Sequence, residues 1–255
     1  MRPILLSLGK INIYSYGTMI AIGIIAAYFL LSTRAKKKGY DEDSIINMTI
    51  ITVIMGVIGG KVFYILTEFS RFLSDPVSII KEFGNGFVVY GAIIFGMITI
   101  YVYCRRKSWD MLEILDLTVP AVALAQGFGR IGCFLAGCCY GKETTSHLSV
   151  VFPAGGLAPV GVHLHPTQLY SAAFDVLLAL FLLWLSKKNK KSGVIFSMYL
   201  ILYSIGRFIV EYFRGDPRGN VSMLSTSQFI AIFILVLGIS VLVLQLRKGR
   251  KSKSE

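Results

Sequence analysis

The sequence predicts an all-α protein that crosses a membrane several times. Hydrophobic residues make up 55% of the 255 residues and charged residues only 16%, whereas a soluble domain carries about 25% charged residues. The net charge is nevertheless +12. This combination indicates that the charges are segregated from apolar blocks, as in a polytopic integral membrane protein. A nucleic-acid-binding protein of this basicity should be richer in charge, so we expect membrane lipid and no nucleic acid among the partners.

Seven apolar segments are long enough to cross a bilayer, because a spanning helix needs about 20 mostly apolar residues. They are residues 14–33, 44–66, 85–104, 111–135, 167–186, 194–213 and 226–246. The first segment begins late and lacks a small-residue cleavage site, which argues against a removable signal peptide. Because the seven segments fill most of the chain, we expect one transmembrane domain over residues 1–255, with an outer loop region at about 136–166.

The orientation follows from the basic residues, which gather in alternate connections. Residues 34–43, 104–110, 187–193 and the C-terminal tail together hold 16 of the 26 lysines and arginines, and the opposite side holds seven. Basic residues favour the cytoplasmic side of a membrane. The sequence therefore predicts an outer N-terminus and a cytoplasmic C-terminus.

The three remaining basic residues, Lys61, Arg130 and Arg207, fall inside apolar segments. A charge at the bilayer centre costs about 3 kcal/mol on insertion scales, so such residues usually face a bundle interior or a polar cavity. Lys61 could pair with an acid, for which Asp175 and Asp116 are possible partners, or extend its ammonium group towards an interface. All three are therefore candidates for function.

Arg207 belongs to a polar series formed by Tyr203, Arg207, Glu211 and Arg214, at spacings of 4, 4 and 3. On a helix these residues share one face. The series could be a structural ion pair within the bundle, or it could line a polar cavity. Residues 214–225 are predicted to form an outer loop, so such a cavity would open towards the outer leaflet.

Arg130 lies in a glycine-rich stretch that runs from Gln126 to Gly141. Glycines weaken a helix but let backbones approach closely, either to another helix or to a ligand. Close packing does not account for an arginine among the glycines. An arginine beside accessible backbone N–H groups suits a phosphate or a similar anion.

Cys133, Cys138 and Cys139 cluster near the outer end of the fourth apolar segment. Their C-x4-C-C spacing is not the usual structural zinc pattern, so no metal site is predicted. Packing as small apolar residues is the favoured interpretation. A disulfide on the outer face and a reactive thiol activated by Arg130 remain open.

His165 precedes Pro166 at the expected start of the fifth helix, where proline suits the first turn. A histidine can act as an acid or base near neutral pH. Equally, His165 could simply cap the helix or hydrogen-bond the loop.

These motifs resemble those of the prolipoprotein diacylglyceryl transferases over nearly the whole chain. The glycine–arginine signature, the His-Pro motif and the Arg-Glu-Arg series occur in the order found in that family. The matching stretches are Tyr14-Ser15-Tyr16-Gly17, Gly59-Gly60-Lys61, Gly129-Arg130-Ile131-Gly132, Tyr140-Gly141, His165-Pro166-Thr167-Gln168-Leu169-Tyr170, and Arg207 to Arg214.

The resemblance implies an enzyme of the bacterial plasma (inner) membrane, with seven spans and an active site open to the outer leaflet. It implies transfer of the diacylglyceryl group of phosphatidylglycerol to the lipobox cysteine of a prolipoprotein signal peptide, without a cofactor. A thioether forms and glycerol phosphate leaves. Arginines suit this chemistry because they stabilise the departing anion, and the attacking thiol needs a base or a positive field.

The resemblance also assigns roles to residues. Arg130 and Arg207 correspond to catalytic or phosphate-binding arginines, and Glu211 corresponds to the acid that orients Arg207. The implied substrate-binding or site-shaping residues are Tyr16, Lys61, Gly141, His165, Tyr203 and Arg214.

Four positions depart from the family pattern. Tyr90-Gly91-Ala92 replaces a usual His-Gly-Gly, and Cys133 replaces an asparagine. Cys138 and Ser171 stand where the family has acids. Tyr90 is therefore a catalytic candidate in place of the histidine, with His165 and Glu211 as alternatives for the base.

Two other functions fit the sequence less well. The first is a divergent membrane lipid-group transferase with another acceptor. The second is a small transporter, in which intramembrane Arg and Glu would line a pathway. The sequence shows no internal repeat of the kind that transporters often have.

Overall fold

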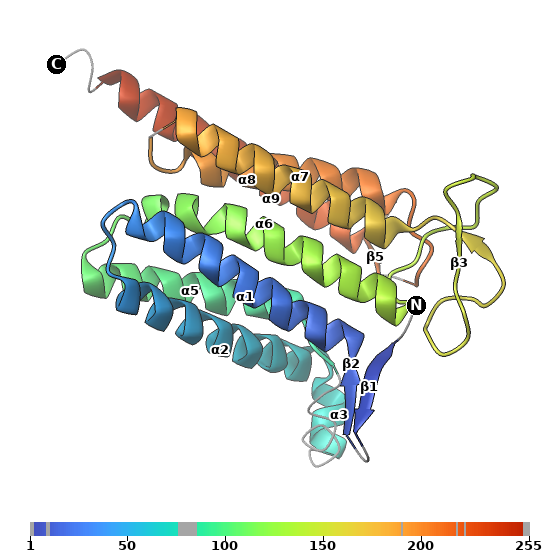
Figure 1. Cartoon of the computed structure of the whole chain (residues 1–255). Helices are drawn as coiled ribbons and strands as arrows, with labels where there is room; N and C mark the ends of the chain where they lie inside the picture. The colour runs from blue at the N-terminus through green and yellow to red at the C-terminus, as the bar shows by residue number, and fades with distance from the viewer. Residues whose placement is uncertain are drawn as a thin grey trace. The chain divides into compact units, whose positions relative to one another are not determined.

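A computed structural model describes residues 3–8, 11–75, 86–189, 191–217, 219–221 and 223–251. The described part of the chain is mostly helical, with short two-stranded antiparallel ribbons in the connections (Figure 1). This confirms the expected mostly helical membrane fold.

Each predicted apolar segment coincides with a helix. The helices are α1 (Ser15–Lys36), α2 (Glu42–Thr67), α3 (Phe69–Ser74), α5 (Val89–Lys107), α6 (Met111–Ala136), α7 (Thr167–Lys188), α8 (Val194–Glu211) and α9 (Thr226–Lys251). The ribbons pair β1 (Ile4–Leu8) with β2 (Ile11–Tyr14), β3 (Val150–Val151) with β4 (His163–Leu164), and β5 (Asn220–Val221) with β6 (Leu224–Ser225).

Six of the described helices, α1, α2, α6, α7, α8 and α9, are long and apolar enough to cross a membrane. The protein is therefore a multi-pass membrane protein. The third predicted span, 85–104, corresponds to α5, which is not among the six, and residue 85 lies outside the described residues. The count of seven spans and the orientation of the termini stay predictions.

The chain divides into two compact units. The larger unit comprises Met1–Leu31 and Leu115–Glu255, and the smaller unit comprises Ser32–Ile114. Each is described by itself below, and the expectation of one transmembrane domain over residues 1–255 stays a prediction.

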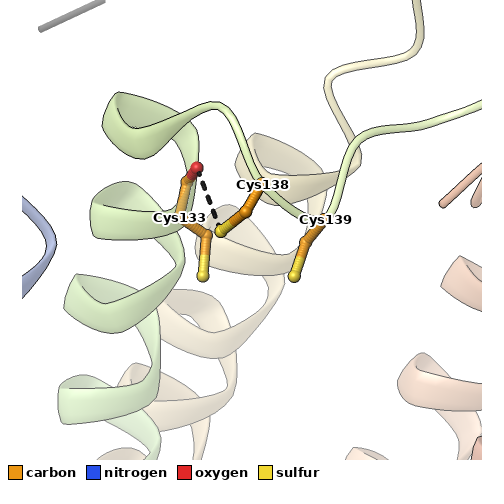
Figure 2. A group of neighbouring side chains, drawn as sticks. All are labelled: Cys133, Cys138 and Cys139. Atoms are coloured by element: carbon orange, nitrogen blue, oxygen red, sulfur yellow. Dashed lines mark hydrogen bonds between the residues drawn. The ribbon is translucent and has the colours of Figure 1, made fainter. Parts of the chain in front are cut away.

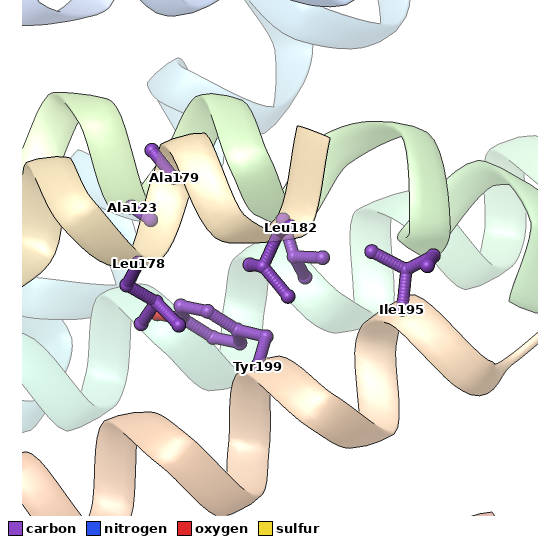
Figure 3. Close-up of a cluster of buried hydrophobic side chains, with 7 residues drawn as sticks. Ala123, Leu178, Ala179, Leu182, Ile195 and Tyr199 are labelled. Atoms are coloured by element: carbon purple, nitrogen blue, oxygen red, sulfur yellow. The ribbon is translucent and has the colours of Figure 1, made fainter. Parts of the chain in front are cut away.

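The core of the larger unit lies where α6, α7 and α8 meet (Figure 3). Its buried side chains are Val119, Ala123, Leu178, Ala179, Leu182, Ile195 and Tyr199. Asp116 of α6 accepts hydrogen bonds from the backbone N–H groups of Gly193 and Phe196, at 2.8 and 2.7 Å. A buried carboxylate thus satisfies the free N–H groups at the start of α8, where a negative charge is favoured.

Helix α1 packs on α6 through glycines. A Cβ atom on Gly23 would lie 3.1 Å from Cβ of Phe128, and one on Gly132 would lie 3.2 Å from the ring of Tyr16. Small residues allow this close approach of helices. The contact places Tyr16 beside the end of α6 that carries the glycine–arginine signature.

In the smaller unit, α2 and α5 meet backbone to backbone at two glycines. A Cβ atom on Gly91 would lie only 2.2 Å from the carbonyl oxygen of Gly59. Just beyond, Gly60 accepts a hydrogen bond from the N–H of Val88. The glycines of the Gly59-Gly60-Lys61 stretch therefore serve helix packing.

Candidate active site

Arg207 and Glu211 form an ion pair one turn apart on α8. The Nη1 atom of Arg207 lies 2.7 Å from Oε2 of Glu211, and their side chains are 15% and 4% exposed. The Nη2 atom of Arg207 donates to Oγ of Ser227 on α9 at 2.8 Å. Helix spacing and a neighbouring helix together fix the direction of this guanidinium group.

Arg130 and Arg207 line one cavity within the larger unit, although they come from different helices. The other lining residues are Ser171, Phe174 and Asp175 of α7 and Tyr203, Gly206 and Val210 of α8. Tyr203 stacks on Tyr199 with ring centroids 5.5 Å apart. The structure therefore brings together the two intramembrane arginines that the sequence singled out, along with Tyr203.

Asp175 is a site residue that sequence reasoning did not assign. Its side chain is buried, it lines the same cavity, and it interacts electrostatically with both Arg130 and Arg207. The sequence alone marks it only as a possible counter-charge for Lys61. The available signal was a carboxylate in the middle of an apolar helix, which is itself a functional marker.

The segments that follow α6, precede α7 and follow α8 join at Gly141. The N–H of Gly141 donates to the carbonyl oxygen of His165, and the N–H of Lys142 donates to that of Phe213. A Cβ atom on Gly141 would lie 2.4 Å from the His165 oxygen and 2.9 Å from the Phe213 oxygen. Only glycine fits between these two backbones.

Arg214 lies beyond the end of α8, which corrects the predicted extension of the polar helix face to this residue. Helix α8 ends at Glu211, and Arg214 pairs in a β-bridge with Gly141. Its guanidinium group makes two hydrogen bonds to Asp216, at 2.9 and 2.8 Å. At Arg214 the chain has left the helix and pairs with the segment that holds Gly141. The side chain of Arg214 therefore contacts Asp216 and not the helical face of α8.

His165 belongs to this junction as well. Its Nδ1 atom lies 3.2 Å from the hydroxyl oxygen of Tyr170, and its ring meets that of Phe213 edge to face. Helix α7 begins at Thr167 directly after Pro166, as the sequence predicted. A role of His165 in substrate binding stays a prediction.

The thiols of Cys133, Cys138 and Cys139 converge at the end of α6 (Figure 2). Their sulfur atoms all lie within 4.8 Å of one another, and all three thiols are free. Arg130 interacts electrostatically with Cys133 and Cys139. Hydrogen bonding with Cys133 and Cys138, opposed by burial and aided by the charge of Arg214, lowers the pKa of the Cys139 thiol below its usual range.

Tyr90 and Lys61 belong to the smaller unit. Tyr90 lies in the first turn of α5, and Lys61 lies on α2 with its ammonium group 5.3 Å from the ring centre of Tyr64. Their proposed catalytic and substrate-binding roles stay predictions.

Comparisons with known proteins identify the family of this chain. The family model described as prolipoprotein diacylglyceryl transferase matches residues 3–244. A phosphatidylglycerol–prolipoprotein diacylglyceryl transferase of Clostridium tetani is 58% identical over 94% of this chain and 96% of its own length. Two such transferases of Clostridium perfringens also match. Number 2 is 55% identical over the full length of both chains, and number 1 is 31% identical over 99% of this chain and 98% of its own length. A match over nearly the whole chain means that the protein belongs to the prolipoprotein diacylglyceryl transferase family.

Proposed function

We propose that this protein transfers the diacylglyceryl group of phosphatidylglycerol to the cysteine thiol of a prolipoprotein. The observation that carries the proposal is the cavity in which Arg130 and Arg207 face a common space. The relatives named above carry both substrates in their names. The membrane helices supply the setting that a lipid donor needs.

In this reaction the acceptor sulfur attacks the carbon of the diacylglyceryl group that is bonded to the phosphate oxygen. The acceptor thiol gives up its proton to a base or to water, a C–S bond forms, the C–O bond breaks, and the electron pair leaves on glycerol phosphate. Negative charge therefore grows on the leaving group in the transition state. Two arginines that line one cavity stabilise that charge, and each guanidinium group can hold phosphate oxygens with paired donors.

The surrounding groups orient the two arginines. Glu211 and Ser227 hold opposite nitrogens of Arg207. The carboxyl group of Asp175 lines the same cavity and interacts electrostatically with both arginines. We assign Glu211 and Asp175 as positioning residues on this basis.

The acceptor of this proposal is the lipobox cysteine of a prolipoprotein signal peptide. The proposed location is the plasma membrane of a bacterium, with the cavity open to the outer leaflet. The segregation of basic residues into alternate connections supports this orientation.

A lipidation assay tests the proposal. The purified protein would be added to phosphatidylglycerol vesicles with a synthetic lipobox peptide, and the peptide mass followed over time. We expect the cysteine peptide to gain one diacylglyceryl group. A matched peptide with serine at that position and vesicles of phosphatidylcholine serve as controls. Absence of any mass gain, with an active family member assayed in parallel, would disprove the proposed function.

A further inference from the structure

The thiols of Cys133, Cys138 and Cys139 form a cluster of possible metal ligands. The cluster lies near Arg130, which also lines the cavity with Arg207. Cys133 lies in the last turn of α6, and Cys138 and Cys139 lie just after it (Figure 2). The backbone at Cys139 is left-handed (φ 60°). Left-handed backbone is uncommon for a cysteine and persists where the surroundings hold it.

The spacing of the sulfurs fits a metal ion. Three thiolates on one tetrahedral zinc ion at 2.3 Å would lie about 3.8 Å apart. The three sulfurs already lie within 4.8 Å of one another. Side-chain rotations that move the sulfur atoms by about 1 Å would therefore complete the tetrahedral geometry. Catalytic zinc sites use three protein ligands and keep the fourth position open for water or substrate.

We propose that Cys133, Cys138 and Cys139 bind one Zn²⁺ ion whose fourth position takes up the acceptor thiol as a thiolate. This inference rests on the proposed function for its substrate, although the metal site itself does not. It supplies a means of thiol activation in a chain where, as the family resemblance implies, Tyr90 replaces a histidine.

The protein holds the backbone of two of the ligands in place. Gln168 donates from Nε2 to the carbonyl oxygen of Cys138 at 2.7 Å, and Thr167 donates from Oγ1 to that of Cys139 at 2.9 Å. Both donors are fully buried in the first turn of α7. Such outer contacts orient metal ligands and are typical of functional sites.

The nearby charges suit a thiolate-bound ion. Three thiolates and Zn²⁺ carry a net charge of −1, and the incoming thiolate brings this to −2. Arg130 interacts with Cys133 and Cys139, and Arg214 interacts with Cys139. The two arginines therefore place positive charge beside the complex, although Arg214 shares its charge with Asp216, and Arg130 also lines the cavity proposed for the phosphate.

The reaction balances without a redox step. On binding zinc the acceptor thiol releases its proton to water, because a coordinated thiol is deprotonated. The zinc-bound sulfur then attacks the glycerol carbon, a C–S bond forms, and the C–O bond to phosphate breaks. Glycerol phosphate departs with the electron pair. The product is a neutral thioether, a weaker zinc ligand than a thiolate, so it leaves and the fourth position reopens.

Metal content tests the site independently of lipidation. The full-length protein would be purified in detergent with a reductant, freed of loose metal, and its zinc measured per chain. We expect about one zinc ion per chain, lost in Cys138→Ser and Cys139→Ser. The matched control Cys104→Ser changes a buried cysteine of α5 in the smaller unit and should retain the metal. Circular dichroism of each variant verifies folding.

Cobalt substitution tests the open position. Co²⁺ bound by thiolates has a characteristic charge-transfer absorption, which should change when the lipobox peptide is added and stay unchanged with its serine analogue. Zinc binding with this response, but without lipidation, would support the site and overturn only the proposed function. Lipidation at full rate by metal-free protein would overturn this inference and leave the proposed function intact. Metal retained in both cysteine variants, or a native disulfide within the cluster, would also overturn it.

Discussion

The two units of the chain use charge in opposite ways. In the larger unit, the ion pairs Arg207–Glu211 and Arg214–Asp216 are at most 17% exposed at either side chain. In the smaller unit, the ion pair Lys38–Glu113 has side chains 46% and 31% exposed. The smaller unit has instead a close backbone contact between two helices, at Gly59 and Gly91, in which no charged side chain takes part.

From this difference we infer that the phosphate-binding chemistry lies in the larger unit, while the roles of Tyr90 and Lys61 in the smaller unit stay predictions. Exposed ion pairs contribute about 0–1 kcal/mol, because water already solvates both charges. Buried charges are costly to desolvate and are weak contributors to stability, so their presence inside apolar helices indicates function. Apart from the candidates Tyr90 and Lys61, substitutions should therefore affect activity in the larger unit and mainly folding in the smaller one.

Removing either cavity arginine should have the largest effect. We expect Arg207→Ala and Arg130→Ala each to lower the lipidation rate about 10²–10³-fold, because a lost transition-state donor costs roughly 3–4 kcal/mol. The measurement is the initial rate of peptide lipidation, with the yield of membrane-inserted protein as the control. Near-normal rates in either variant would place the phosphate elsewhere.

Neutralising Asp175 should have a smaller effect with a distinct signature. We expect Asp175→Asn to lower kcat about tenfold, equivalent to about 1.4 kcal/mol, without raising KM for phosphatidylglycerol. Losing a positioning charge misdirects the arginines but leaves the cavity more positive for an anionic lipid. Steady-state kinetics at varied lipid content measure both constants. A raised KM with unchanged kcat would contradict the positioning role.

Enlarging Gly91 should destabilise the smaller unit. The added Cβ of Gly91→Ala would lie 2.2 Å from a backbone oxygen of α2, so the helices must separate at a cost of about 1–3 kcal/mol. Thermal unfolding in detergent measures the effect. The matched control on the same helix is Gly96→Ala, whose Cβ would make an ordinary 3.5 Å contact with Thr52. Equal melting temperatures for the two variants would refute the packing role.

Removing an exposed charge should have the smallest effect. We expect Lys38→Met to change the free energy of unfolding by less than about 0.5 kcal/mol, because water and salt screen its ion pair with Glu113. Lipidation rates should stay at the wild-type level. A loss of activity in folded Lys38→Met protein would show that the smaller unit's charges matter to the reaction after all.

The sequence predicted the helices well because their apolar lengths are set by the bilayer. The fifth segment was expected at 167–186 and is observed at Thr167–Lys188. Arg130 and Arg207 were identified from the cost of intramembrane charge, and the pairing of Arg207 with Glu211 follows from helix periodicity alone.

What lies outside helix periodicity could not be predicted in this way. The interaction of Asp175 with both arginines depends on how α6, α7 and α8 pack together. Arg214 departs from the helical face, and distant backbone segments bond beside it. The C-x4-C-C spacing argued against a metal, yet the three sulfurs lie together at the end of α6.

The sequence by itself determined the membrane class, the helix positions, the family resemblance and the charged residues that need an explanation. These follow from hydropathy and local spacing, which act along the chain. Only the tertiary structure decided which of those residues share a cavity, which carboxylates face the arginines, and that three cysteines converge. Such encounters depend on helix packing and loop closure between residues far apart in the sequence, and no local pattern encodes them.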